Sequence, residues 1–161
     1  MLGVCLLYVG IVLINNGVCR LQNVEGKAAA VMNVFTGFLS LIINVISIIQ
    51  GDYYAAATGL LFGFTYLFAA ANNIFRLDTI PYGWFSLFVA INTIPCAAID
   101  FNGGDWKMGV IWILWGILLL TGFIECVMKK DLKKFVPYLA IFEGIITAWI
   151  PGFLMLRGMW L

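Results

Sequence analysis

Long apolar stretches follow one another along almost the whole chain, and this feature limits the fold more than any other. A helix needs about 20 apolar residues to cross the roughly 30 Å of hydrocarbon in a bilayer. Six stretches reach or approach that length, at residues 2–19, 28–49, 54–75, 82–99, 106–128 and 135–156. None of them has the alternating pattern of a transmembrane β-strand. The sequence therefore predicts an all-α integral membrane protein with six transmembrane helices, forming a single domain over residues 1–161.

Composition and charge exclude several other functions. Apolar residues make up 63% of the chain and charged residues 11%, whereas a soluble domain is closer to half apolar and a quarter charged. The charged residues gather in short connections, which leave no room for a catalytic domain outside the membrane. Because the sequence contains no histidine, it cannot form a His-based metal site, acid–base pair or pH switch. We expect no enzymatic activity, no cofactor, no metal and no nucleic-acid partner.

Lysine and arginine fall mainly on one side of the predicted membrane. The connections after the first, third and fifth stretches contain Arg20, Lys27, Arg76, Lys129, Lys130, Lys133 and Lys134, and the opposite side has Lys107 and Arg157. Basic loops usually remain in the cytoplasm. This asymmetry predicts that both termini lie outside.

An internal repeat relates the first, third and fifth stretches. Gly10, Gly63 and Gly116 lie 53 residues apart, within LYVGIVLI, LLFGFTYL and LWGILLL. Internal symmetry of this kind is typical of transporters and channels. It predicts three pseudo-repeated helical hairpins around a pore, with equivalent faces of the odd helices directed toward a common axis.

Prolines mark the fourth and sixth stretches in the same way. PYGWFSLFVAINTIP and PYLAIFEGIITAWIP both begin with Pro-Tyr and end with Ile-Pro. Pro81 and Pro137 suit the first turn of a helix, where no N–H is needed. Pro95 and Pro151 fall deeper, and we expect them to kink or end their helices.

The repeated face of the odd helices, together with one acid, forms the predicted solute path. We call its members the path residues: Leu6, Val9, Leu13, Phe62, Tyr66, Trp112, Trp115, Leu118, Leu119 and Glu143. A rise of 1.5 Å per residue predicts an inner level, about 9–14 Å below the cytoplasmic surface, and a more apolar outer level farther from that surface. The inner level holds Leu13, Tyr66, Leu119 and Glu143, and the outer one holds Val9, Phe62, Trp115 and Leu118. Aromatic residues at helical spacing are also typical of simple packing, so both interpretations stay open here.

Glu143 lies in the middle of the sixth stretch, far from any connection. A carboxylate at such a depth costs about 2.5 kcal/mol or more, and intramembrane acids are functional by default. The alternative is a protonated Glu143 that bonds a neighbouring helix for structural reasons. A hydrogen bond from Tyr66 would favour the ionised carboxylate, whereas burial alone would favour the neutral acid. The other acid near a helix end, Glu125, lies within a turn of Lys129, and we expect its side chain either to extend to the membrane surface or to pair with Lys129.

The chemistry of the path residues points to a class of solute. Their walls are aromatic and aliphatic with a few hydrogen-bonding groups, and they lack the ring of carbonyls or acids found in cation filters. A small, flat, neutral and polar solute suits such a path. Its N–H groups would donate to Glu143 while its flat face slides along Phe62 and Trp115.

Several long strings of the sequence are similar to one known family. LLYVGIVLINNG, ATGLLFGFTYLFAAANN, PYGWFSLFVAINTIP, GDWKMGVIWILWG and LAIFEGIITAWIP resemble the AmiS/UreI family of bacterial urea and short-chain amide channels. The resemblance implies six helices arranged as three hairpins, with the termini outside the bacterial inner membrane. It further implies a homohexamer with one pore in each protomer and lipid in the central hole, and it assigns the pore constrictions largely to the path residues.

Two departures from the family pattern affect the expected function. Acid-gated members have a long, His-rich outer loop between the second and third helices, where this sequence has only IIQGDYYAA. Acid-gated urea channels also have tryptophan at the position of Leu119. We therefore expect a passive channel for urea or short aliphatic amides that is not proton-gated and that supplies a cytoplasmic urease or amidase. The alternatives are a proton-coupled transporter with Glu143 as the proton carrier, and a membrane enzyme subunit or structural partner.

Overall fold

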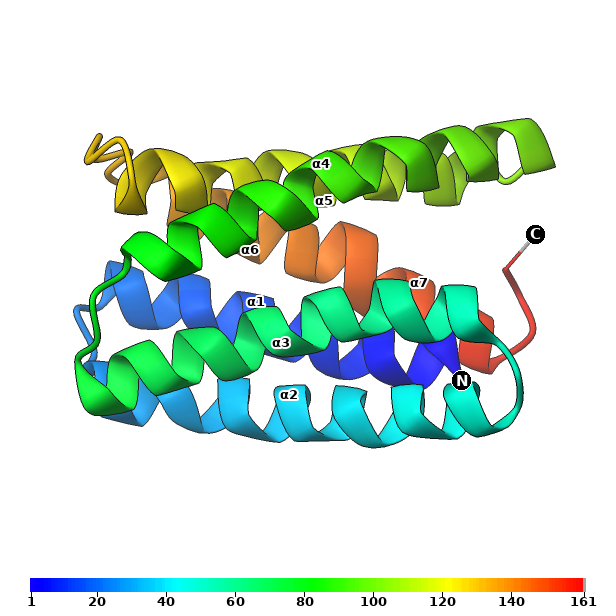
Figure 1. Ribbon diagram of the computed structural model, residues 1–161, viewed down its shortest axis with the longest axis horizontal. Helices are drawn as coiled ribbons and strands as arrows, with labels where there is room; N and C mark the ends of the chain where they lie inside the picture. Colours follow the sequence, from blue (N-terminus) through cyan, green and yellow to red (C-terminus); the bar gives the residue numbers. More distant parts are fainter. Residues whose placement is uncertain (161) are drawn as a thin grey trace.

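Six helical spans run back and forth along one axis in the computed structural model, which describes residues 1–160 (Figure 1). The first five are α1 (Leu2–Leu21), α2 (Gly26–Ile49), α3 (Tyr53–Phe75), α4 (Ile80–Gly103) and α5 (Trp106–Cys126). The sixth span is continuous but composite: α6 (Phe135–Glu143), the π-helix η1 (Gly144–Trp149) and α7 (Ile150–Leu156). Each span is long and apolar enough to cross a membrane. The predicted all-α architecture of six transmembrane helices is confirmed.

The start of α1 and the end of α7 lie at the same end of the bundle, which we call the terminus end (Figure 1). Two helices begin at this end after an aspartate cap. The Asp52 carboxylate accepts a hydrogen bond from the Ala55 N–H at 3.1 Å, and the Asp105 carboxylate accepts one from the Met108 N–H at 3.0 Å. These caps satisfy amide donors that the first helical turn leaves free. They explain why α3 and α5 start where they do.

The outside of the bundle is apolar, and its interior contains polar as well as apolar side chains. Large apolar side chains such as Phe35 and Ile94 are exposed on the outside of the bundle. The buried polar residues include Asn33, Thr36, Ser40, Asn44, Ser86, Thr93 and Thr147. Small and polar residues between helices allow close packing and interhelical hydrogen bonds in lipid. The bundle is therefore a multi-pass membrane protein whose helices meet through their small and polar faces.

The helices associate as three antiparallel pairs. The most extensive packing joins α2 with α3, α4 with α5, and α1 with the sixth span. In Figure 1 the α2–α3 pair and the α4–α5 pair lie on opposite sides, with α1 and α6 between them in this view. The predicted arrangement in three helix pairs is thus present, and each pair contains one odd and one even helix. The α2–α3 and α4–α5 pairs are hairpins, whereas the third pair joins the first and last spans, which no loop connects.

The repeated glycines occupy the contact point of each pair. A methyl group on Gly10 would lie 2.8 Å from the Trp149 backbone nitrogen, and one on Gly63 would lie 2.7 Å from the Ser40 hydroxyl. A methyl group on Gly116 would collide with the Thr93 hydroxyl. The 53-residue repeat therefore has a physical cause: at each site, only glycine lets the odd helix approach its partner.

We expect Gly10→Ala to destabilise the protein strongly. The added methyl group would meet backbone atoms of η1, which cannot move aside as a flexible side chain would. Overpacking of this kind costs about 1–3 kcal/mol. Gly103→Ala is the matched control, because nothing lies within 4 Å of its added methyl group. The melting temperatures of the two variants in detergent check this, and equal values would contradict the proposed contact.

The deeper prolines do not end their spans. Pro95 lies inside α4, which continues to Gly103, and Pro151 lies in the first turn of α7. A proline in a helix lacks the N–H donor and clashes with the carbonyl four residues earlier. Before Pro151 the chain avoids a regular α-turn by forming η1, in which hydrogen bonds skip one further residue. This π-helix directly follows Glu143.

Candidate functional site

A cavity of about 880 Å³ extends along the bundle between the hairpins. At the terminus end its lining includes Asp52, Asp100 and Asp105. At the opposite end, which we call the basic end, Arg20 and Glu125 line it. Since its wall contains residues from both ends of the helices, the cavity follows the axis that a transmembrane path would take.

Nine of the ten path residues line this cavity, and Glu143 does not. The nine are Leu6, Val9, Leu13, Phe62, Tyr66, Trp112, Trp115, Leu118 and Leu119. They come from α1, α3 and α5, as the repeat predicted for equivalent faces of the odd helices. The structure thus brings together residues that lie more than 100 positions apart in the sequence.

Three aromatic rings form one contiguous surface of the cavity. The Phe62 ring centroid lies 5.0 Å from that of Trp115 and 5.7 Å from that of Trp112. The two indoles meet edge to face at 5.2 Å. Leu6 belongs to the same buried cluster. Ring pairs at such separations attract one another beyond simple area burial, so this aromatic wall is a defined surface.

The remaining path residues group differently from the predicted levels. Val9, Leu13 and Tyr66 form a second cluster, against which Leu118 packs. Leu119 instead packs against Val89 and Ala90 of α4. Neighbouring residues on a helix point about 100° apart, so Leu118 and Leu119 pack against different clusters although both line the cavity.

Both indole N–H groups of the aromatic wall are held by acceptors within the protein. The Trp112 Nε1–H donates to Asp100 Oδ2 at 2.6 Å. The Trp115 Nε1–H donates to Thr147 Oγ1 at 2.9 Å. Asp100 and Thr147 were not among the predicted site residues, because no spacing rule links either of them to a tryptophan on another helix. As a result, these two rings present only carbon surfaces to the cavity.

Glu143 lies behind the cavity wall. Its side chain has no solvent exposure, and neither carboxyl oxygen has a hydrogen-bond partner in the described part of the chain. Neither the hydrogen bond from Tyr66 nor the structural bond to a neighbouring helix is found among residues 1–160. An unsatisfied buried group costs about 1–3 kcal/mol. The role of Glu143 in the solute path remains a prediction. Because Glu143 does not line the cavity, a solute could contact it only after side chains of the wall move.

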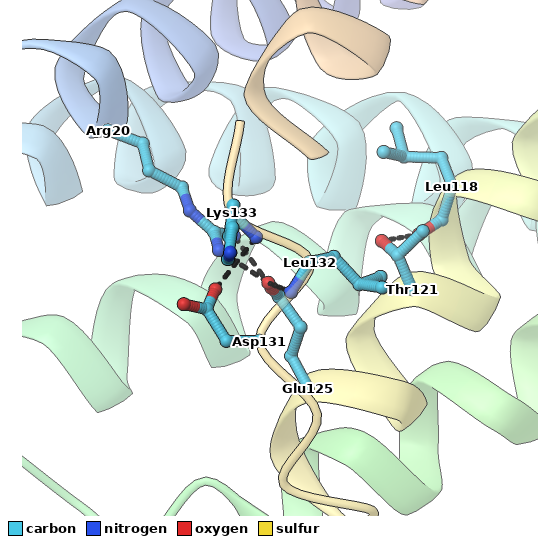
Figure 2. A network of polar contacts seen from close by, with 7 residues as sticks. All are labelled: Arg20, Leu118, Thr121, Glu125, Asp131, Leu132 and Lys133. Atoms are coloured by element: carbon cyan, nitrogen blue, oxygen red, sulfur yellow. Dashed lines mark hydrogen bonds and ion pairs between the residues drawn. The ribbon is translucent and has the colours of Figure 1, made fainter. Parts of the chain in front are cut away.

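An ion pair bridges the cavity wall at the basic end (Figure 2). Two guanidinium nitrogens of Arg20 donate to the two carboxylate oxygens of Glu125 at 2.6 and 2.5 Å. The same carboxylate accepts a hydrogen bond from the Leu132 backbone N–H at 3.2 Å. The pair therefore joins α1, the end of α5 and the following loop. Both partners are partly exposed, so its net contribution to stability is only about 1 kcal/mol.

Of the two roles expected for Glu125, pairing with Lys129 is not found in the part of the chain that the structure describes, because Glu125 pairs with Arg20. An i,i+4 pair requires a continuous helix, but α5 ends at Cys126 and Lys129 has a left-handed backbone with φ of 54°. Glu125 binds Arg20 instead, which lies 105 residues earlier. No local pattern in the sequence indicates this contact.

Two carboxamides add polar character to the wall near the basic end. The Asn16 side chain donates to the Asn33 carboxamide oxygen at 2.9 Å, and Asn33 donates back to Asn16 at 2.7 Å. This reciprocal pair links α1 with α2. Both residues line the cavity, so its walls carry amide groups beyond the aromatic region.

The sequence matches a family model described as AmiS/UreI family transporter over residues 1–159. The chain belongs to the AmiS/UreI family. Its relatives include the acid-activated urea channel of Helicobacter pylori strain ATCC 700392 / 26695, which is 48% identical over 195 residues, with 99% of this chain and all of the relative covered. A putative amidate substrates transporter protein of Mycolicibacterium smegmatis is 41% identical over 165 residues, covering 98% of this chain and 78% of that protein.

Solved structures of an AmiS/UreI relative have the same fold. The cryoEM structure of the Helicobacter pylori urea channel in the closed state matches with a TM-score of 0.94, and the crystal structure of that channel matches with 0.93. Each is 50% identical in sequence, and each match covers both chains completely. Together with the six spans, membership in this family identifies a membrane protein of a transporter family and not of an enzyme family.

Proposed function

We propose that this AmiS/UreI protein is a passive channel for urea and short-chain aliphatic amides. The observation that carries the proposal is the cavity that follows the bundle axis, lined by an aromatic wall with both of its indole N–H groups already bonded. The relatives named for urea and for amidate substrates support the same class of solute. The channel would reside in a bacterial inner membrane and supply a cytoplasmic urease or amidase.

The walls suit a planar, uncharged solute. An ion would lose its hydration against the carbon surfaces of Phe62, Trp112 and Trp115 without finding replacement ligands. A planar amide loses less hydration energy than an ion, because its faces can lie against the rings while its edges reach the few polar groups. The Tyr66 side chain lines the cavity, and the Glu143 carboxyl behind the wall has no hydrogen-bond partner among residues 1–160. Both groups could exchange hydrogen bonds with an amide.

The proposed orientation places the basic end in the cytoplasm and both termini outside. The basic end carries Arg20 together with the lysines at positions 129, 130, 133 and 134, and the positive-inside rule favours its cytoplasmic location. We further propose a homohexamer with one path in each protomer and lipid in the central hole. Exposed apolar side chains such as Phe35 and Ile94 would face lipid or neighbouring protomers.

Stopped-flow light scattering on proteoliposomes tests the proposal. Vesicles with the protein should equilibrate urea and acetamide much faster than vesicles of the same lipids without it. Sodium and chloride should enter vesicles with the protein no faster than vesicles without it. If neither urea nor acetamide crosses faster than through lipid alone, the proposed function is wrong.

The channel should conduct at neutral pH without acid activation. The chain has no histidine, and histidine is the side chain whose ordinary titration falls between about pH 5 and 8. The alignment with the acid-activated relative is 195 residues long, whereas this chain has 161, so the relative has residues with no counterpart here.

We therefore expect the urea flux to change less than about twofold between pH 5 and pH 7.5. The Helicobacter pylori channel, reconstituted in the same lipids, is the positive control for activation by acid. A strong rise in flux at pH 5 in the present protein would show that a group other than histidine gates it.

A proton-coupled transporter is the second candidate function, and one observation favours it. Glu143 is a buried acid without a partner among the described residues, and intramembrane acids often carry protons in transporters. Such a protein would accumulate its solute against a gradient, which a passive channel cannot do.

A further inference from the structure

A chain of two hydrogen bonds connects the aromatic wall to the sixth span. The Trp115 Nε1–H donates to Thr147 Oγ1 at 2.9 Å, and the Thr147 hydroxyl donates to the Glu143 backbone carbonyl at 2.6 Å. All three residues are buried, and the Thr147 side chain is 1% exposed. Water therefore does not compete for either bond.

Thr147 suits this position because a hydroxyl group can donate and accept at the same time. Threonine on a membrane helix commonly donates to the carbonyl of the residue four positions earlier, and here that carbonyl belongs to Glu143. This first bond fixes the direction of the hydroxyl, so that its lone pairs remain for Trp115. Thr147 lies in η1, the π-helical turn.

The indole that Thr147 holds is central to the aromatic wall. Trp115 contacts Phe62 at 5.0 Å and Trp112 at 5.2 Å between ring centroids, and it lines the cavity. A tryptophan side chain turns about two bonds, and a ring beside a cavity has space on one side into which it can turn. The bond to Thr147 removes that freedom.

We propose that Thr147 is a positioning residue that fixes the Trp115 indole and thereby sets the size limit for solutes. The inference rests on the proposed function, since a size limit matters only if solutes pass. It assigns a selectivity role to a residue that does not itself line the cavity. It also predicts that the Trp115 N–H does not bind passing carbonyl groups, because that donor is already used.

Three substitutions in proteoliposomes test this role. Thr147→Val keeps the shape and branching of the side chain but removes the hydroxyl, and Thr147→Ser keeps the hydroxyl. Thr93→Val is the matched control, because Thr93 is similarly buried and its hydroxyl donates to the Ala90 carbonyl of its own helix, with no bond to another helix found among residues 1–160. The measured quantity is the ratio of acetamide flux to isobutyramide flux.

We expect Thr147→Val to lower this ratio about fivefold, consistent with the loss of one buried hydrogen bond. Thr147→Ser and Thr93→Val should keep the wild-type ratio. In a Trp115→Phe background, which lacks the indole N–H, adding Thr147→Val should change the ratio little, because the pair no longer interacts. A wild-type ratio in Thr147→Val, or an equal effect in both backgrounds, would overturn the proposal.

An independent measurement does not require transport. In protein labelled with ¹⁵N at the tryptophan indoles, the Trp115 N–H signal, assigned by its loss in Trp115→Phe, should shift in Thr147→Val and exchange faster with solvent. Thr147→Ser should leave it in place. An unshifted signal in Thr147→Val would contradict the bond, whereas wild-type vesicles that pass neither urea nor acetamide would contradict only the proposed function.

Discussion

Glu143→Leu should lower urea and acetamide flux about tenfold or more, the equivalent of losing one strong hydrogen bond to the solute, while leaving the protein at least as stable as wild type. The two parts of this expectation have different physical causes. Intramembrane acids are functional by default, and Glu143 is the acid closest to the middle of its span. Its carboxyl group makes no hydrogen bond within residues 1–160, so leucine removes a desolvation cost without breaking a side-chain hydrogen bond.

Glu143→Gln is the matched control for the shape of the side chain. Glutamine keeps an acceptor oxygen at nearly the same position, so a channel that needs only an acceptor should retain much of its flux. Melting temperatures measured on the same preparations separate function from folding. If Glu143→Leu folds and conducts like the wild type, Glu143 has no role in the path. If it fails to fold, the acid is structural and has a partner in the membrane-embedded protein.

Trp115→Ala should have the second largest effect, through the loss of the aromatic wall. The variant loses the contacts with Phe62 and Trp112 and leaves the Thr147 hydroxyl without its donor. Removing a large aromatic side chain from a packed interior costs up to about 3–5 kcal/mol. The cavity would widen at this level, so isobutyramide should pass nearly as fast as acetamide, and the melting temperature should fall.

The control for this variant is Trp106→Ala, at the start of α5. Trp106 is 62% exposed and does not line the cavity along the axis. Its removal should alter neither the acetamide to isobutyramide ratio nor the melting temperature by a comparable amount. If Trp115→Ala keeps the wild-type ratio, the aromatic wall does not select solutes by size.

The sequence was sufficient to predict the six spans because length and hydropathy determine what can cross a bilayer. The repeat of Gly10, Gly63 and Gly116 was also readable, since close helix packing needs glycine at equivalent sites. The same period relates eight of the nine path residues that the structure places along one cavity, all except Leu118. These features depend on hydropathy and on the spacing of residues along the chain, and both can be determined from a single sequence.

Contacts between distant segments could not be predicted in this way. Thr147 holds Trp115 and Asp100 holds Trp112, and neither pair has a fixed spacing that identifies it. The Arg20–Glu125 ion pair depends on where α5 ends, which hydropathy places only within a few residues. The π-helix between Glu143 and Ile150 interrupts a span that hydropathy predicts as one regular helix, so the burial of Glu143 behind the wall could not be predicted either.

The most direct test of passive conduction is an uptake measurement with labelled urea and acetamide in proteoliposomes, under an imposed proton gradient and with an uncoupler added in parallel. A channel predicts that the internal concentration rises to the external one and no further, at a rate the uncoupler does not change. Accumulation above the external concentration that collapses when the uncoupler is added would contradict the channel and favour a proton-coupled transporter.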